Sequence, residues 1–187
     1  ISALNLGVIW VSVMVSLLWS GAASRVFVVA WPHNYLRRHG IRVTAMELSG
    51  VGVWSSQLRY GNPAEVGEAA AELEELGFTA LWIPDVGGPV FDSVDRLMGA
   101  TKEVVIATGI LNLWMHTPAE TAAAYASLTA AHGDRFLLGI GVSHAPLIDA
   151  GEPGRYRRPL AATREYLDGL DAADQPVPVE NRVLAAL

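Results

Sequence analysis

Residues 135–144 read Arg-Phe-Leu-Leu-Gly-Ile-Gly-Val-Ser-His, an apolar run that stops abruptly at small and polar residues. Residues 108–114, Thr-Gly-Ile-Leu-Asn-Leu-Trp, and residues 80–85, Ala-Leu-Trp-Ile-Pro-Asp, follow the same pattern. Buried strands of a parallel sheet read as continuous apolar runs, and functional groups collect just past their carboxyl ends. The three runs therefore predict neighbouring strands that deliver polar groups to one rim of an α/β fold.

Strand and helix signals alternate along the chain after Met46. Asn62 and Thr117 each precede a proline, which favours the start of a helix, and Thr117 forms a capping box with Glu120. The pattern predicts strands over 51–54, 80–83, 104–111 and 136–142, and helices over 63–76, 91–100, 118–131 and 160–170. Such alternation indicates a parallel sheet with right-handed crossovers. It fits either a complete doubly wound sheet or half of a (β/α)8 barrel, which needs about 250 residues.

The composition excludes several classes of protein. Hydrophobic residues make up 51% of the chain and charged residues 17%, which argues against disorder. The absence of cysteine rules out disulfides and thiolate metal sites. All 19 acidic residues follow Met46, and an acidic body argues against a nucleic-acid partner. No metal-ligand spacing is found in the sequence, and Gly139-Ile-Gly141 is a weak dinucleotide-binding signal because it lacks the third glycine.

The two ends of the chain differ from its body. Residues 1–45 have three interpretations: an extension that does not belong to the natural protein, a membrane anchor over Ala3–Ala23, or an extra soluble segment. No basic residue precedes the apolar stretch, so a cleaved signal peptide is less favoured. Residues 181–187 read as the opening of an amphipathic helix without a cap, which predicts that the chain is a fragment.

Five stretches then decide between the two architectures. They are Gly-Val-Trp-Ser-Ser (52–56), Leu-Gly-Phe-Thr-Ala-Leu-Trp-Ile-Pro-Asp (76–85), Ala-Thr-Gly-Ile-Leu-Asn (107–112), Thr-Pro-Ala-Glu-Thr-Ala (117–122) and residues 135–144. In this order the sequence resembles the luciferase-like monooxygenase superfamily, and within it the oxidoreductases that use the deazaflavin coenzyme F420. The resemblance covers residues 46–187 and implies a TIM-type (β/α)8 barrel. Family members are close to twice this length, so residues 46–187 would hold about the first four βα units, the N-terminal half of the barrel.

The resemblance also implies a cofactor lying across the C-terminal rim of the barrel. Asp85 and His144 are the expected catalytic residues, and Trp54 and Ser55 are expected to contact the substrate. In several deazaflavin dehydrogenases a histidine follows the acid, whereas Val86 follows it here. A non-proline cis peptide is expected at Gly109-Ile110. The residues expected to bind the cofactor are Asp85, Gly109, Ile110, Asn112, Ser143 and His144.

Each of these residues also has a structural interpretation. Asp85 and Asn112 are typical of turns, Gly109 of a strand, and His144 of an exposed loop. Trp54 would then only pack at the barrel end. The remaining candidates are expected to be structural: Trp82 in the core, His132 at a helix C-terminus and His116 in a surface loop.

The implied activity is hydride transfer between C5 of F420 and a small organic substrate. An FMN-dependent monooxygenase is the alternative with the same fold and rim. A third hypothesis is a non-catalytic half-barrel that needs a partner, because its open strand edges and apolar face would be uncovered. The full-length protein is expected to be a cytoplasmic homodimer, with a membrane contact only if residues 3–23 are genuine.

Overall fold

The fold is built on a parallel sheet. The computed structural model describes residues 12–15, 26–30, 48 and 50–184 of the chain. Its main strands, in spatial order, are β3 (Val51–Ser55), β4 (Ala80–Ile83), β5 (Val105–Thr108) and β7 (Phe136–Gly141). The short strand β6 (Leu111–Asn112) follows β5 and pairs with the end of β7. Strand β8 (Arg182–Leu184) pairs in parallel with β7, so six strands between residues 51 and 184 contribute to one sheet.

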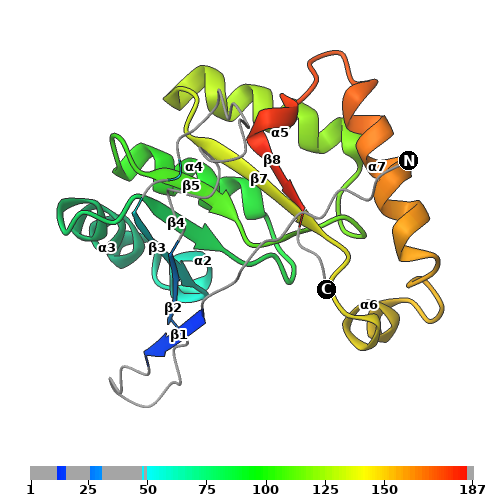
Figure 1. Cartoon of the computed structure of the whole chain (residues 1–187), viewed down its shortest axis with the longest axis horizontal. Helices are drawn as coiled ribbons and strands as arrows, with labels where there is room; N and C mark the ends of the chain where they lie inside the picture. Colours follow the sequence, from blue (N-terminus) through cyan, green and yellow to red (C-terminus); the bar gives the residue numbers. More distant parts are fainter. Residues whose placement is uncertain (1–11, 16–25, 31–47, 49, 185–187) are drawn as a thin grey trace, which may run out of the picture.

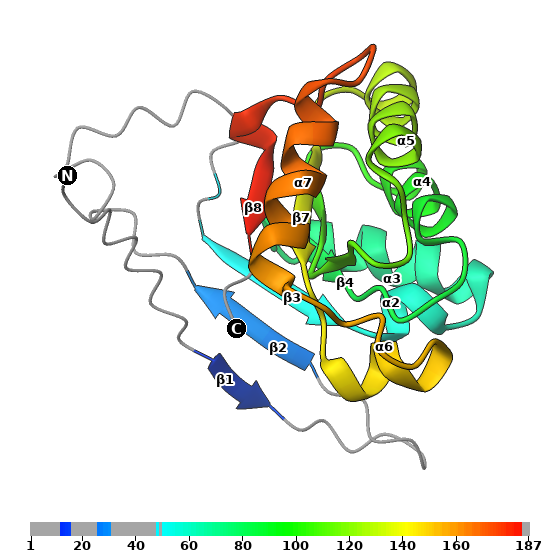
Figure 2. The ribbon, with the colours of Figure 1, turned by 90° about the vertical axis from the view of Figure 1, so that its right-hand side faces the viewer.

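The helices connect these strands, and Figure 2 shows α3, α4 and α5 together on one side of the sheet. Asn62 caps α3 by accepting a hydrogen bond from the Ala64 N–H, and Thr117 and Glu120 form the predicted capping box of α5. Figure 1 labels the α-helices of the described residues, which are α2 (Gln57–Tyr60), α3 (Pro63–Glu75), α4 (Val90–Ala100), α5 (Pro118–His132), α6 (Ala145–Gly151) and α7 (Pro159–Asp171). The 3₁₀ helix η1 (Val179–Asn181) follows α7 in the sequence.

Both faces of the sheet are buried, as the continuous apolar runs predicted. On β4, Leu81 and Ile83 belong to the large core beneath the helices, whereas Trp82 belongs to a smaller cluster on the other face. Trp82 is buried, as expected. Gly139 on β7 cannot carry a side chain, because a Cβ atom there would lie 2.0 Å from the carbonyl oxygen of Thr108.

The predicted strands and helices after Met46 are confirmed, with two corrections. The third strand is interrupted at Gly109 and Ile110, between β5 and β6. The helix predicted to open at Asn181 is wrong, because residues 182–184 form strand β8. The edge of β7 offers backbone hydrogen bonds to this segment, and the Arg182 side chain anchors it to Asp171 at 2.7 Å. Residues 185–187 lie outside the described part.

Most of residues 1–45 lies outside the described residues, so the three interpretations of this segment stay open there. Two short pieces are described: β1 (Ser12–Val15) pairs antiparallel with β2 (Val26–Ala30), and β2 pairs antiparallel with β3. Strand β1 falls inside Ala3–Ala23, so this piece of the apolar stretch is extended rather than helical. No helix in the described ranges has the length and apolar character needed to cross a membrane.

Candidate functional site

Asp85, directly after β4, is the centre of a buried polar cluster at the carboxyl ends of the strands. Its Oδ2 atom lies 2.9 Å from Nε2 of His116 and accepts a hydrogen bond of 3.1 Å from the backbone N–H of Asn112. Its Oδ1 atom accepts a hydrogen bond of 3.3 Å from the Gly87 N–H. Asp85 is 2% exposed, so these groups replace the water that would otherwise solvate the carboxylate.

The electrostatics of this cluster favour an ionised Asp85. Burial raises the pKa of its carboxyl group, but the hydrogen bond from His116 and those from two backbone N–H groups outweigh burial and lower the pKa overall. An ionised carboxylate only accepts hydrogen bonds, so Nε2 of His116 carries a proton. In neutral His116 the other nitrogen, Nδ1, is then the acceptor. The imidazole packs against the ring of Phe91, with 5.4 Å between ring centroids.

The interruption between β5 and β6 joins this cluster to the neighbouring strand. The peptide bond between Gly109 and Ile110 is cis, which confirms the expectation from the resemblance. The Gly109 N–H donates to the carbonyl of Ile83 at 2.7 Å, and the Asp85 N–H donates to the carbonyl of Ile110 at 3.2 Å. Asp85 is therefore held through its backbone as well as through its carboxylate.

Trp54, at the end of β3, contacts the same interruption. Its indole Nε1 donates a hydrogen bond of 2.6 Å to the carbonyl of Gly109, and a Cβ atom at Gly109 would lie 3.0 Å from the indole ring. Glycine is therefore the residue that admits the ring at this distance. Ser55 is buried, and its Oγ accepts a hydrogen bond from the Gln57 N–H. Contact of Trp54 and Ser55 with a substrate stays a prediction.

Asn112 was expected either to bind the cofactor or to form a turn, and its two side-chain atoms differ in this respect. Its Oδ1 accepts a hydrogen bond of 3.2 Å from the Trp114 N–H, as a turn-forming asparagine does. Its Nδ2 is fully buried and has no hydrogen-bond partner in the described part of the chain. Buried amide groups are rarely left without a partner, so Nδ2 is a donor at this site that fits an added acceptor such as a ring carbonyl.

No hydrogen bond or ion pair joins His144 to Asp85. His144 is the exposed residue before α6, and its carbonyl accepts the N–H groups of Leu147 and Ile148. Its imidazole makes no hydrogen bond or ion pair with any residue of the described ranges. Ser143, beside it, is buried with a φ of +56°. Their expected roles with the cofactor stay predictions.

His116 is the site residue that the sequence analysis missed. It lies in the loop before α5, as expected, but not at the surface, because its side chain is 16% exposed and pairs with Asp85. The signal that would have found it is its position: His116 follows the end of the third strand, at the rim where Asp85 and Asn112 were expected. His132, in contrast, pairs with Asp95 at 2.7 Å on the outer side of the fold.

The fold and the site together define a class of protein: an α/β fold with its polar cluster at the carboxyl ends of parallel strands, the arrangement found in (β/α)8 enzymes. The sequence model of the luciferase-like monooxygenase family matches residues 41–177. The chain therefore belongs to the luciferase-like monooxygenase family. Within the described ranges, no group of three or more histidine, aspartate or glutamate side chains is arranged to hold a metal ion.

Two similar proteins bear on the chain's place in this family. Rv3520c of Mycobacterium tuberculosis, named as a coenzyme F420-dependent oxidoreductase, is 32% identical over 121 residues, which are 63% of this chain and 33% of Rv3520c. The solved F420-dependent tetrahydromethanopterin reductase of Methanopyrus kandleri aligns with a TM-score of 0.54 and 18% identity. That alignment covers 72% of this chain and 43% of the reductase, and it shows the shared fold. The chain thus spans a third to less than half of the length of these proteins.

Proposed function

We propose that this chain forms the ring-facing part of the cofactor site of an oxidoreductase that transfers a hydride between coenzyme F420 and a small organic substrate. The observation that carries the proposal is the buried Asp85 carboxylate, held by His116 and Asn112 next to the cis bond at Gly109. The name of the relative Rv3520c supports F420 as the cofactor.

The residues at the site fit the planar ring of a deazaflavin or flavin, which carries carbonyl and N–H groups on one edge. Asn112 supplies the unpartnered buried donor for a ring carbonyl. At Gly109 the space that a side chain would take is filled by the indole of Trp54, so a flat ring bound beside the interruption would lie against this indole.

When bound, the deazaflavin supplies the hydride chemistry at C5, while the protein contributes binding, orientation and electrostatics. Asp85 fixes the ring of His116 and its Nε2 proton, so Nδ1 of neutral His116 is the atom able to take up a proton. Asn112 and the backbone at Gly109 would orient the cofactor, and Trp54 would form the wall beside it. These are positioning and proton-holding tasks.

The test is a titration of F420, and separately of FMN, into the protein expressed from its complete gene. Cofactor fluorescence and absorbance are followed to saturation. Saturable binding of F420 with weaker or no binding of FMN is the expected result. Binding of FMN alone would replace the proposal by an FMN-dependent monooxygenase, and binding of neither would overturn it in favour of a non-catalytic protein.

A further inference from the structure

Arg59 is a buried guanidinium on the short helix α2, and it contacts the loop that follows Asp85. The residue is 7% exposed, and none of the ion pairs between described residues includes it. Burying a charged side chain is costly unless hydrogen bonds satisfy it. Its partners therefore indicate what this burial maintains.

The partners of Arg59 lie on two different elements. Its Nη2 donates a hydrogen bond of 3.0 Å to the carbonyl of Gly87, and its Nη1 donates one of 2.8 Å to Oγ of Ser93 on α4. The guanidinium also lies over the ring of Tyr60, 4.8 Å from its centroid. The hydroxyl oxygen of Tyr60 accepts a hydrogen bond of 3.1 Å from the Val86 N–H. Two consecutive residues of α2 thus hold the loop.

The held loop leads directly to the candidate site. Gly87, whose carbonyl accepts from Arg59, donates its own N–H to Oδ1 of Asp85 at 3.3 Å. Gly87 has a φ of +123°, a conformation that glycine adopts without steric cost but that nothing in its own side chain enforces. External contacts must therefore fix this residue, and the bond from Arg59 is one of them.

We propose that Arg59 is a positioning residue for Asp85. Its bond to the Gly87 carbonyl keeps the Gly87 N–H on Oδ1 of the carboxylate, and so keeps Oδ2 directed at His116 and Asn112. The geometric part of this inference stands alone, whereas its consequence for cofactor binding rests on the proposed function.

The first test follows the ionisation of Asp85 by NMR, through its carboxyl carbon and the amide proton of Gly87, in wild type and in Arg59→Met. The titratable groups facing Asp85 are His116 and, on α7, Tyr166, so both are followed in the same spectra. In Arg59→Met the midpoint of the Asp85 titration is expected to move to higher pH. The chemical shift of the Gly87 amide proton is expected to stop following the ionisation of Asp85. Unchanged values for both would overturn the proposal.

Two further variants make this test decisive. Ser93→Ala removes the other partner of Arg59 without touching Gly87, so its Asp85 midpoint is expected to equal that of wild type. Lysine keeps the charge but cannot hold two acceptors in the fixed fork of arginine. Arg59→Lys is therefore expected to shift the midpoint in the same direction. If Arg59→Met does not fold and Asp85 titrates in Arg59→Lys as in wild type, Arg59 only stabilises the packing of α2 against α4, and the proposal fails.

The second test is a double-mutant cycle on F420 affinity with Asp85→Asn. Arg59→Met removes the hydrogen bond to the Gly87 carbonyl, and this loss is expected to weaken F420 binding by about tenfold. If Arg59 acts through Asp85, it adds no further loss in the Asp85→Asn background. Independent, multiplying effects would contradict the proposal. If wild type itself binds no F420, the proposed function fails while the NMR test still decides the role of Arg59.

Discussion

At the amino ends of the strands Glu74 and Arg135 each bind three residues of the backbone, whereas at the carboxyl ends Asp85 pairs with the His116 side chain as well as with backbone N–H groups, and a buried donor of Asn112 has no described partner. Glu74 accepts hydrogen bonds from the N–H groups of Lys102, Glu103 and Val104, at 2.7 to 3.1 Å. Arg135 donates to the carbonyls of Met98, Thr101 and Val104 and to Oγ1 of Thr101. At the opposite ends of these strands, Nδ2 of Asn112 has no partner among the described residues.

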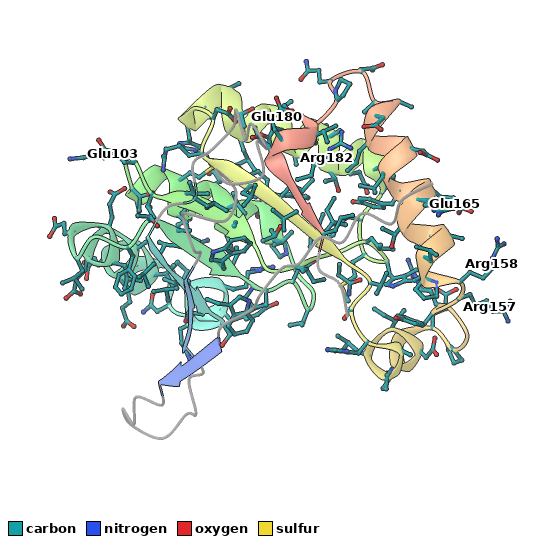
Figure 3. The ribbon with its side chains drawn as sticks, in the orientation of Figure 1. Glu103, Arg157, Arg158, Glu165, Glu180 and Arg182 are labelled. Carbon is teal, nitrogen blue, oxygen red and sulfur yellow. The ribbon has the colours of Figure 1, made fainter. Side chains whose placement is uncertain are left out.

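This difference separates the groups that hold the fold from those available to a ligand. Figure 3 shows the two ends: Glu103 lies before β5, while Arg157 and Arg158 point outward from the loop beyond the far end of β7. In barrels of this type the amino ends of the strands serve stability and the carboxyl ends carry the site. The comparison therefore predicts large stability effects at Glu74 and Arg135, and small ones at Asp85 and Asn112.

The largest stability effect is expected at Arg135. Arg135→Met removes hydrogen bonds to three carbonyl groups and should lower the free energy of unfolding by about 3 kcal/mol. Urea unfolding followed by circular dichroism measures it. Arg164→Met, at an exposed position on α7, is the matched control, with an expected change within about 0.5 kcal/mol. A loss below 1 kcal/mol at Arg135 would show that this end is not the stabilising one.

Glu74 is expected to come next. Glu74→Ala leaves three backbone N–H groups without their acceptor, and because the site is partly open to water the expected loss is about 2 kcal/mol. The neighbouring Glu75 is exposed and makes no such bonds, so Glu75→Ala is the control in the same urea series. Equal losses in the two variants would contradict the assignment.

Asp85 is expected to contribute less, in a pH-dependent way. Its folded pKa is lowered, so its ionised form stabilises the fold above the unfolded carboxyl pKa of about 3.9, and this contribution is lost as the pH falls through the folded pKa. Asp85→Asn should cost about 1 kcal/mol at pH 7. The difference from wild type should shrink below about pH 4. A difference that is constant across pH would mean that Asp85 is not ionised in the fold.

The smallest effect is expected at Asn112. Asn112→Ala removes one hydrogen bond to the Trp114 N–H but also removes a buried donor that had no partner, so the two changes largely cancel. The free energy of unfolding should stay within about 1 kcal/mol of wild type. A loss above 2 kcal/mol in the same urea assay would place Asn112 among the stabilising residues.

The sequence predicted the strands and caps because local signals determine them. Asn62 and Thr117 cap their helices as expected, and the apolar runs at 80–83 and 136–142 contain the buried strands β4 and β7. Strand β8 was missed because its three residues gain hydrogen bonds only from β7, which no local pattern shows.

The site was predicted in part for a similar reason. Asp85 follows the end of β4 and Asn112 lies at the end of β6, and a position at the carboxyl end of a strand is visible in the sequence. The pairing of Asp85 with His116 joins residues 31 positions apart, and the contact of Arg59 with Gly87 joins residues 28 apart. Both contacts depend on how the loops fold back over the strands, and neighbouring residues carry no signal for that.

The most direct test of the central claim compares F420 affinity in variants from the two ends of the sheet. Asp85→Asn and His116→Ala should each weaken binding at least about tenfold, through loss of a charge-assisted hydrogen bond at the site. Glu74→Ala, measured where it is fully folded, should bind like wild type. Wild-type affinity in Asp85→Asn, or an equal loss in Glu74→Ala, would contradict the separation of a stabilising end from a binding end.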